Sequence, residues 1–316
     1  MDLSYCVVNT NGRGYLRGCL NAIRAGTPAG LDTELLVLDN SSEDGSVEEI
    51  EAWNAGADGV GAALRLFALE RREGKATCDS LLLREASGEL CLLLNEDTEL
   101  RAGAVEALVA ALRGEPEAVA AGANLLDPDG VPQPSAWRLP GLATSLAGAL
   151  FMHRLLVTES RGRRIREVGW VQSAAMLVRR QAVAAVGYLD PEFFVYSDET
   201  DLCKRLHDAG GRILWVPAAH AIHHEQLATD RAAGAARVVE FHRGRDRYLR
   251  KHHSTAVALL ARALGAWAYA ARALAASVLP GHDAAWYWLH ARQALRPDRG
   301  AGLREAAAAY NRARAR

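Results

Sequence analysis

Three short polar clusters follow apolar runs in the first hundred residues, and their side chains suit phosphate, ribose or metal binding. They are residues 9–11 (Asn-Thr-Asn), 39–41 (Asp-Asn-Ser) and 95–97 (Asn-Glu-Asp). Each apolar run is typical of a buried strand. Polar caps on helices would explain single clusters, but they do not easily explain three clusters at the same expected sheet edge. This arrangement predicts a ligand site at that edge.

The cluster that starts at Asp39 continues to Ser46. A carboxylate at a strand end can accept hydrogen bonds from a base or a ribose, and free backbone N–H groups at the start of the next helix favour an anion. A loop that only caps this helix is the alternative.

The acidic cluster at 95–97 suits a hard divalent cation. Mg²⁺ and Mn²⁺ prefer oxygen ligands, and they often take only one or two carboxylates together with substrate phosphates. An incidental acidic turn would look the same in the sequence.

A third acidic group follows the aromatic residues at 193–196 and comprises Asp198, Glu199 and Asp201. Desolvation and like charge can raise the pKa of a carboxyl group, as a general base for a hydroxyl proton requires. Asp198 and Asp201 are expected to share a helix face, with Glu199 about a quarter turn away. Acidic residues in a first helical turn also stabilise the helix dipole, which is the alternative use.

Three histidines, His220, His223 and His224, follow an expected strand at 212–216 that Pro217 closes. A histidine can complete a divalent metal site. A solvated loop histidine is the simpler interpretation of each one.

The elements that would position these residues alternate regularly along the chain. Strands are expected at 3–8, 34–39, 63–69, 90–94 and 118–124, and helices at 13–25, 44–55, 76–86 and 102–112. This order predicts an α/β fold with a mainly parallel, Rossmann-like sheet flanked by helices, whose ligands bind at the carboxyl ends of the strands.

The rest of the chain departs from this alternation. Residues 127–167 include a turn and a basic stretch at 161–166, regular structure resumes at 170–178, and a helix is expected from about Ser197. We predict a catalytic domain at 1–236, with a nucleotide-binding half at 1–126 and an acceptor half at 127–236. A helical extension is expected at 237–316, with fraying beyond Pro297.

Bulk properties exclude some classes. Half of the 316 residues are hydrophobic, which allows a large core, and a formal net charge of −1 gives no basic footprint for nucleic acid. Five scattered cysteines without a CxxC pair favour a reducing cytoplasm. No signal peptide is expected, and Arg262 and Arg272 interrupt the most apolar stretch, residues 256–279.

Together the clusters resemble family 2 glycosyltransferases of the GT-A fold, particularly the rhamnosyltransferase-like branch. The resemblance covers about residues 3–251 and rests on five segments in order. They are the strand ending at residues 9–11, residues 39–46, residues 94–98, the run 176–196 and the acidic block 198–203, followed by the spacing to His223.

The resemblance implies particular roles. Asp39 falls at the base-binding position, Asp97 is the principal ligand of Mg²⁺ or Mn²⁺ with His223 beside it, and Glu199 falls at the catalytic carboxylate. The remaining residues assigned to catalysis or donor binding are Asp198, Asn9, Thr10, Asn11, Lys75 and Asn95.

Three departures from the family pattern lie near the expected nucleotide-sugar donor or near the catalytic carboxylate. The usual order of Glu and Asp is reversed at Asp198-Glu199, the usual Asn-x-Gly-Phe segment is residues 72–75 here, and Ser80 replaces an asparagine. Asp198 and Glu199 could therefore exchange roles, and the donor sugar is left open. Solvated helix-start residues are the alternative for Arg72 and Lys75.

The resemblance therefore predicts a metal-dependent, inverting glycosyltransferase. Its donor would be a nucleotide diphosphate sugar, with UDP- and dTDP-sugars favoured. Its acceptor would be a hydroxyl group in a glycan, a polyprenyl-linked molecule or a natural product. Arginines and aromatic residues after 237 leave open peripheral membrane contact through the C-terminal helices, and a homodimer is a further option. The alternative is a non-catalytic nucleotide-sugar-binding protein on the same fold. A nucleotidyltransferase is disfavoured because no glycine-rich phosphate loop with a lysine follows the first strand.

Overall fold

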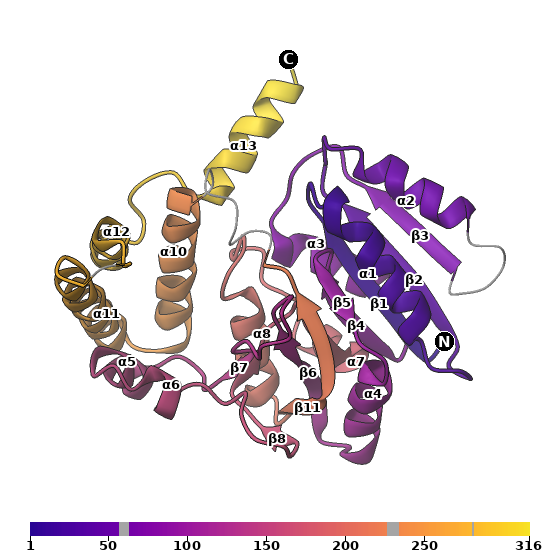
Figure 1. The fold of residues 1–316 in the computed structure, drawn as a ribbon, viewed down its shortest axis with the longest axis horizontal. Coiled ribbons are helices and arrows are strands. Elements are labelled where there is room, and N and C mark those ends of the chain that lie inside the picture. The colour runs from indigo at the N-terminus through magenta and orange to yellow at the C-terminus, as the bar shows by residue number, and fades with distance from the viewer. Residues whose placement is uncertain (57–62, 226–233, 280) are drawn as a thin grey trace.

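A computed structural model describes residues 1–56, 63–225, 234–279 and 281–316. The described residues form a mixed sheet with the strand order β3-β2-β1-β4-β10-β6-β11-β5, and β8 also pairs with β11 (Figure 1). Its strands are β1 (Leu3–Asn9), β2 (Thr33–Asp39), β3 (Ala63–Ala68), β4 (Leu90–Asn95), β5 (Thr98–Leu100), β6 (Ala118–Leu126), β8 (Arg166–Glu167), β10 (Ala175–Arg179) and β11 (Arg212–His223). A separate pair joins β7 (Ala136–Trp137) to β9 (Trp170–Val171).

Helices cover both faces of this sheet. Their bounds are α1 (Arg13–Gly26), α2 (Ser46–Ala55), α3 (Lys75–Glu85), α4 (Ala104–Gly114), α7 (Arg180–Ala185) and α8 (Asp198–Asp208). Tyr5 and Val7 of β1 face a core shared with α1, α2 and α4, whereas Cys6 and Val8 face a core shared with α3, α7 and α8. Because β1 is buried on both sides, its sequence is a nearly continuous apolar run.

The prediction of a mainly parallel α/β sheet is confirmed, and the strands of its first half are parallel. β3, β2, β1 and β4 run in one direction, while β10 is antiparallel to both of its neighbours and β5 is antiparallel to β11. The regular structure expected at 170–178 consists of two strands, β9 and β10, which are separated by a turn at Ser173.

The prediction that Pro217 closes the last strand is wrong. β11 continues to His223, and its register against β6 shifts between Val216 and His220. Proline has no N–H to donate to a strand ladder, so it is tolerated at such an irregularity. The continuation carries His223 to a position opposite Thr98 of β5.

The C-terminal part of the chain is helical and packs against the sheet domain. It comprises α10 (Gly234–His252), α11 (Thr255–Ala276), α12 (Ala284–Leu295) and α13 (Leu303–Arg314), and α5 (Leu142–Ala149) with α6 (His153–Leu156) lies against α11 (Figure 1). The expected fraying beyond Pro297 is wrong, because α13 is a regular helix with its own contacts to the first half of the chain. The proposed boundary at residue 236 stays a prediction.

One helix among the described residues, α11, is long and apolar enough to cross a membrane by length and composition alone. It packs against α5, α10 and α12. A third of its most apolar window is buried inside the fold.

Candidate active site

The carboxyl ends of three parallel strands bring the N-terminal polar clusters together. Asn9 lies opposite Asp39 in the register of β1 and β2, and Val8 lies opposite Asn95 in the register of β1 and β4. The expected common edge is therefore present, and it carries side chains from all three clusters.

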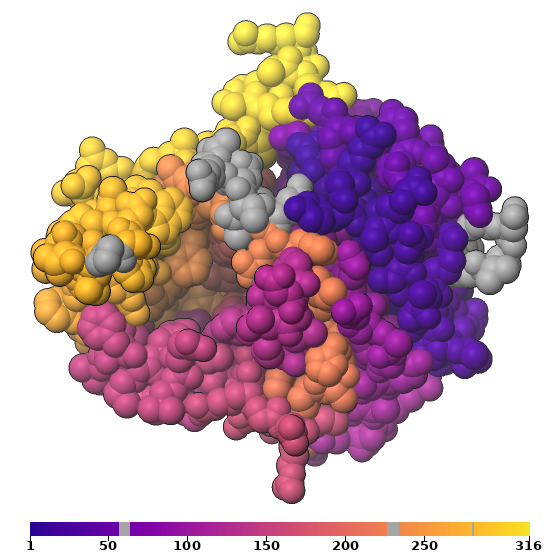
Figure 2. Space-filling view, in the orientation of Figure 1, coloured from indigo at the N-terminus to yellow at the C-terminus, as the bar shows by residue number. Residues whose placement is uncertain are grey.

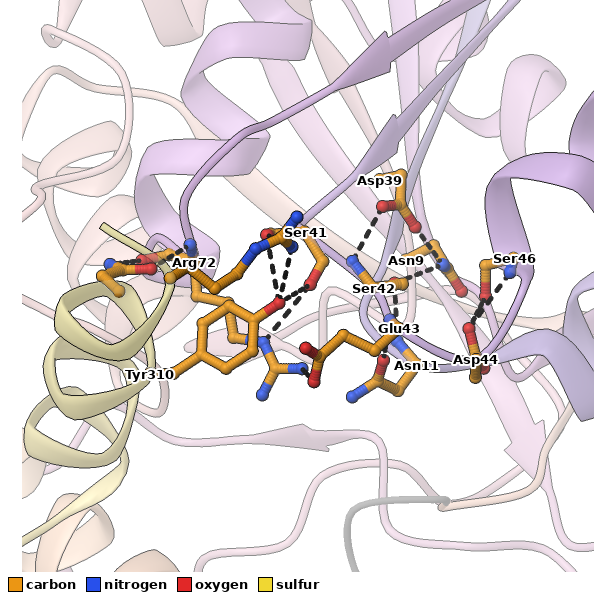
Figure 3. Close-up of polar contacts among 12 residues, drawn as sticks. Asn9, Asn11, Asp39, Ser41, Ser42, Glu43, Asp44, Ser46, Arg72 and Tyr310 are labelled. Carbon is orange, nitrogen blue, oxygen red and sulfur yellow. Dashed lines mark hydrogen bonds and ion pairs between the residues drawn. The ribbon is translucent and has the colours of Figure 1, made fainter. Parts of the chain in front are cut away.

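Asp39 is held firmly within this edge. Its Oδ1 accepts a hydrogen bond from Asn9 Nδ2 at 2.7 Å, and its Oδ2 accepts one from the backbone N–H of Ser42 at 2.9 Å. Asp39 is buried, and Asn11 reaches across to the same loop by accepting from the N–H of Glu43 at 2.8 Å (Figure 3). Each carboxylate oxygen keeps a second lone pair. The capping role and the ligand-binding role are therefore compatible.

Asp97 and His223 lie side by side. The Oδ1 of Asp97 is 3.5 Å from Nε2 of His223, and Asn95 Nδ2 is also 3.5 Å from that nitrogen. Burial lowers the pKa of His223, although the charge of Asp97 opposes this shift. The imidazole is therefore neutral near pH 7, the form in which histidine binds a metal.

This pair fits a divalent cation whose other ligands come from a substrate. Within the described residues no group of three or more His, Cys, Asp or Glu side chains is arranged as a metal site. A cation held by a carboxylate and an imidazole would need phosphate and water oxygens as well, which is usual for Mg²⁺ at a diphosphate. The buried Nδ1 of His223 has no hydrogen-bond partner in the described part of the chain, whereas its Nε2 faces Asp97 and Asn95.

Glu96 also contributes to this edge, although the sequence predicted no separate role for it. Its Oε1 accepts from the N–H of Thr10 at 3.2 Å, and a Cβ on Gly12 would lie 2.3 Å from its Cγ. Burial and the neighbouring Asp97 raise the pKa of Glu96 to about 8. The glycine after the first polar cluster therefore makes room for a carboxyl group between strands β1 and β4.

Lys75, at the start of α3, joins this edge to the acidic block of α8. Its Nζ donates to Asp79 Oδ2 at 2.7 Å. Burial alone would lower the pKa of Lys75, but the charges of Asp79 and then Asp198 outweigh burial and raise it. The ammonium group is therefore charged at neutral pH.

The solvated alternative for Arg72 and Lys75 is wrong, since both side chains are largely buried and paired. Asp79 was missed in the sequence, although its position four residues after Lys75 on a helix is the signal that could have found it. Ser80 is used structurally, because its hydroxyl donates to the carbonyl of Leu189 at 3.2 Å and accepts from the N–H of the same residue at 3.1 Å.

Asp198 and Glu199 are adjacent carboxyl groups in the first turn of α8. Burial, followed by the charge of Asp198, raises the pKa of Glu199 well above the ordinary value for a glutamate. Asp198 is almost fully buried, whereas Glu199 is only partly buried. Glu199 thus combines access with a raised pKa, the two properties that a general base for a hydroxyl needs.

The start of α8 is held in an unusual backbone conformation. Tyr196 and Ser197 have φ values of 65° and 66°, and a Cβ on Gly244 of α10 would lie 2.6 Å from the carbonyl oxygen of Tyr196. Consecutive left-handed residues other than glycine persist only where surrounding contacts enforce them. Arg237 of α10 supplies one such contact by donating to the Tyr196 hydroxyl at 3.1 Å.

Asp201, which was grouped with the acidic block, has a structural use. It accepts from Arg205 at 2.8 Å, from Lys251 at 2.8 Å and from His252 at 2.7 Å. Two of these partners are in α10, so Asp201 fastens the C-terminal helices to α8. Nearby in the acceptor half, Trp137 of β7 stacks on Trp170 of β9 with ring centroids 4.3 Å apart.

Helix α13 returns to the loop after β2. Tyr310 donates to the carbonyl of Ser41 at 3.0 Å, and the guanidinium of Arg72 lies 3.8 Å above the Tyr310 ring (Figure 3). Asn311 accepts from the N–H of Arg72 at 2.8 Å and donates to its carbonyl at 3.0 Å. A space-filling view shows α13 beside the N-terminal half (Figure 2). The last helix therefore braces two segments near Asp39 and Lys75.

We expect Tyr310→Ala to loosen this brace by about 1–2 kcal/mol, because the change removes a cation–π contact and a hydrogen bond. Trypsin should then cleave within α13 roughly 5- to 30-fold faster, while Tyr310→Phe, which keeps the ring, should lie between this variant and the wild type. Tyr287→Ala in α12 is the control. Equal cleavage of all four proteins would mean that Tyr310 does not hold α13 in place.

The arrangement of sheet, strand-edge carboxylates and acidic helix defines the GT-A class. Among solved structures of that class, the chain is similar to GalNAc-T7 in complex with UDP, GalNAc and Mn²⁺, with a TM-score of 0.62, 16% identity and coverage of 93% of this chain and 54% of that one. It is also similar to the mannosyltransferase PcManGT of Pyrobaculum calidifontis with GDP-Man and Mn²⁺, with a TM-score of 0.59, 17% identity and coverage of 99% and 85%. At such identities the likeness establishes the fold alone.

The family model for glycosyl transferase family 2 matches residues 4–163, and the chain belongs to this family. It is 32% identical over 171 residues to the N-acetylglucosaminyl-diphospho-decaprenol L-rhamnosyltransferase of Mycobacterium tuberculosis, which is 52% of this chain and 55% of the relative. It is 44% identical over 57 residues to the rhamnosyltransferase WbbL of Escherichia coli, which is 18% and 22%. The match thus spans about half the length of the mycobacterial relative, and the resemblance to rhamnosyltransferase-like members is confirmed.

Proposed function

We propose that the chain is an inverting glycosyltransferase that moves a sugar from a nucleotide diphosphate donor to an acceptor hydroxyl. The observation that carries the proposal is the gathering of Asp97, His223, Lys75 and Glu199 from separate elements around one sheet edge in a family 2 chain. None of these residues would be decisive alone.

The donor is expected to lie across the ends of β1, β2 and β4, with the loop 39–46 at the nucleoside. Asp97 and His223 would hold Mg²⁺ or Mn²⁺, which supplies positive charge beside the leaving diphosphate when bound. The ammonium of Lys75 adds a protein charge near the same group. UDP- and dTDP-sugars remain the favoured donors.

The acceptor hydroxyl is expected to approach Glu199. The carboxylate takes the hydroxyl proton as the acceptor oxygen bonds to the anomeric carbon, and the bond to the diphosphate oxygen breaks on the opposite face. One displacement inverts the anomeric configuration. The mycobacterial relative is an N-acetylglucosaminyl-diphospho-decaprenol L-rhamnosyltransferase, which supports a polyprenyl-diphosphate-linked acceptor. We also propose that the chain acts in the cytoplasm.

A panel of nucleotide sugars tests the donor assignment through thermal stability. A ligand at 100 times its Kd stabilises the native state by about 2.7 kcal/mol, so the matching donor should raise the Tm with Mn²⁺ and do so much less with EDTA. Stabilisation that is identical with EDTA would contradict the metal-dependent site. Absence of stabilisation by every nucleotide and nucleotide sugar would contradict the proposed function.

A further inference from the structure

Helices α5, α6 and α11 expose a continuous apolar surface outside the catalytic site. Large hydrophobic side chains are more than one-third exposed on α5 and in and around α6, namely Leu142, Leu146, Leu150, Phe151, Met152, Leu155 and Leu156. Leu142, Leu146 and Leu150 are four residues apart, so they form one stripe. Scattered exposed leucines are common on soluble proteins, but seven within fifteen residues are a contiguous patch of the kind that marks an interaction site.

The outer face of α11 extends this patch. Every exposed residue of α11 is uncharged, and the large ones are Leu259, Leu260, Trp267 and Leu274. Trp267 is 60% exposed, and Arg272 of α11 lies over the ring of Phe151 at 4.9 Å. α5 also packs along α11, so the two apolar stripes lie on neighbouring helices (Figure 1).

The chain segment that forms α5 and α6 and continues to Arg166 carries mostly positive charge. Residues 140–166 contain five arginines and one acidic residue, Glu159, in a chain whose net charge is −1. Four of those arginines, at 161, 163, 164 and 166, are exposed on the segment directly after α6. α11 contains no acidic residue. An apolar face followed directly by a basic segment suits the acyl chains and headgroups of an anionic bilayer.

We propose that α5, α6 and α11 dock this chain on the surface of an anionic lipid bilayer, with the helices lying in the interface. α11 lies in the plane because its other face is packed on α10 and α12 and its Arg262 donates to Asp246 at 2.6 Å. A second copy of the chain is the competing occupant, and the experiment below distinguishes it from a bilayer. This proposal does not depend on sugar transfer.

Flotation of the full chain with lipid vesicles tests the proposal without any donor or acceptor. We expect binding to phosphatidylcholine vesicles that contain about one-third phosphatidylglycerol, at least tenfold weaker binding to pure phosphatidylcholine, and weakening by salt. Arg163→Ala with Arg164→Ala should lower the partition coefficient more than tenfold, since each arginine near a charged surface contributes about fivefold. Leu146→Gln with Trp267→Gln should lower it at least tenfold.

Matched controls carry the same kinds of change elsewhere. Val131→Gln replaces an exposed apolar residue in a turn, and Arg17→Ala with Arg113→Ala removes two surface arginines from α1 and α4. Control proteins that bind as the wild type does, together with unchanged Tm values for all variants, would support the proposal. The proposal would be overturned if the wild-type protein bound equally well to vesicles with and without phosphatidylglycerol. It would also be overturned if the arginine and Leu146/Trp267 variants floated as the controls do. A wild-type dimer that Leu146→Gln with Trp267→Gln dissociates would assign the surface to a second copy instead.

Discussion

Replacing Asp97 by alanine is expected to lower kcat/KM for sugar transfer by on the order of 10²- to 10³-fold, because the change removes charge stabilisation at the leaving diphosphate. Asp97 lies 3.5 Å from His223 at the end of β4, where both side chains can reach one cation. Steady-state transfer assays over a range of Mn²⁺ concentrations measure the effect. The variant should also lose the dependence of its rate on Mn²⁺.

The matched control is Asp129→Ala, which removes an exposed aspartate from a turn. Its kcat/KM should stay within about twofold of the wild type. Thermal unfolding of both variants separates loss of metal binding from loss of folding. A fully active, Mn²⁺-dependent Asp97→Ala enzyme would contradict the assignment of Asp97 as a metal ligand.

Replacing Glu199 by glutamine is expected to lower kcat by on the order of 10²- to 10⁴-fold, as removal of a general base does. The amide keeps the size of the side chain but cannot take the acceptor proton. Asp198→Asn is the natural comparison, since Asp198 is adjacent and nearly fully buried, and its loss should cost less than about tenfold. Both variants should bind donor and Mn²⁺ as the wild type does.

The pH dependence adds a second readout. The raised pKa of Glu199 means that the carboxyl group is protonated at low pH and becomes a base only as the pH rises through that value. We expect log kcat to rise with pH, with an apparent pKa above the value of about 4.3 for a free glutamate, and Glu199→Gln to remove this limb. If Asp198→Asn removed the limb while Glu199→Gln retained it, the base would be Asp198.

The local arrangement of the first half of the chain was predictable because each strand is short, apolar and followed by polar residues. The strand of residues 34–39 and its final Asp39 were located correctly, since burial on both faces gives a continuous apolar run. The partnership of Asp97 with His223 was expected only through family resemblance. It depends on a strand that passes Pro217, and proline rules based on local sequence predict a stop there.

Contacts between residues that are far apart in the sequence could not be predicted from the sequence. Nothing local to Tyr310 or Asn311 indicates that they contact the loop after β2, because those contacts join residues more than 230 positions apart. The same limit applies to Asp201, whose partners Lys251 and His252 are in another helix. Ion-pair partners of this kind are fixed by the tertiary fold, whereas i,i+4 pairs such as Lys75 and Asp79 are fixed by helix geometry.

The central claim is sugar transfer, and turnover of the stabilising nucleotide sugar tests it most directly. Release of nucleoside diphosphate should be measured with Mn²⁺, with and without polyprenyl-linked and soluble acceptors. The account predicts release that Mn²⁺ stimulates, that an acceptor accelerates, and that Asp97→Ala and Glu199→Gln suppress. Tight binding of a nucleotide sugar with no release in the presence of any acceptor would contradict it and would identify a binding protein on this fold.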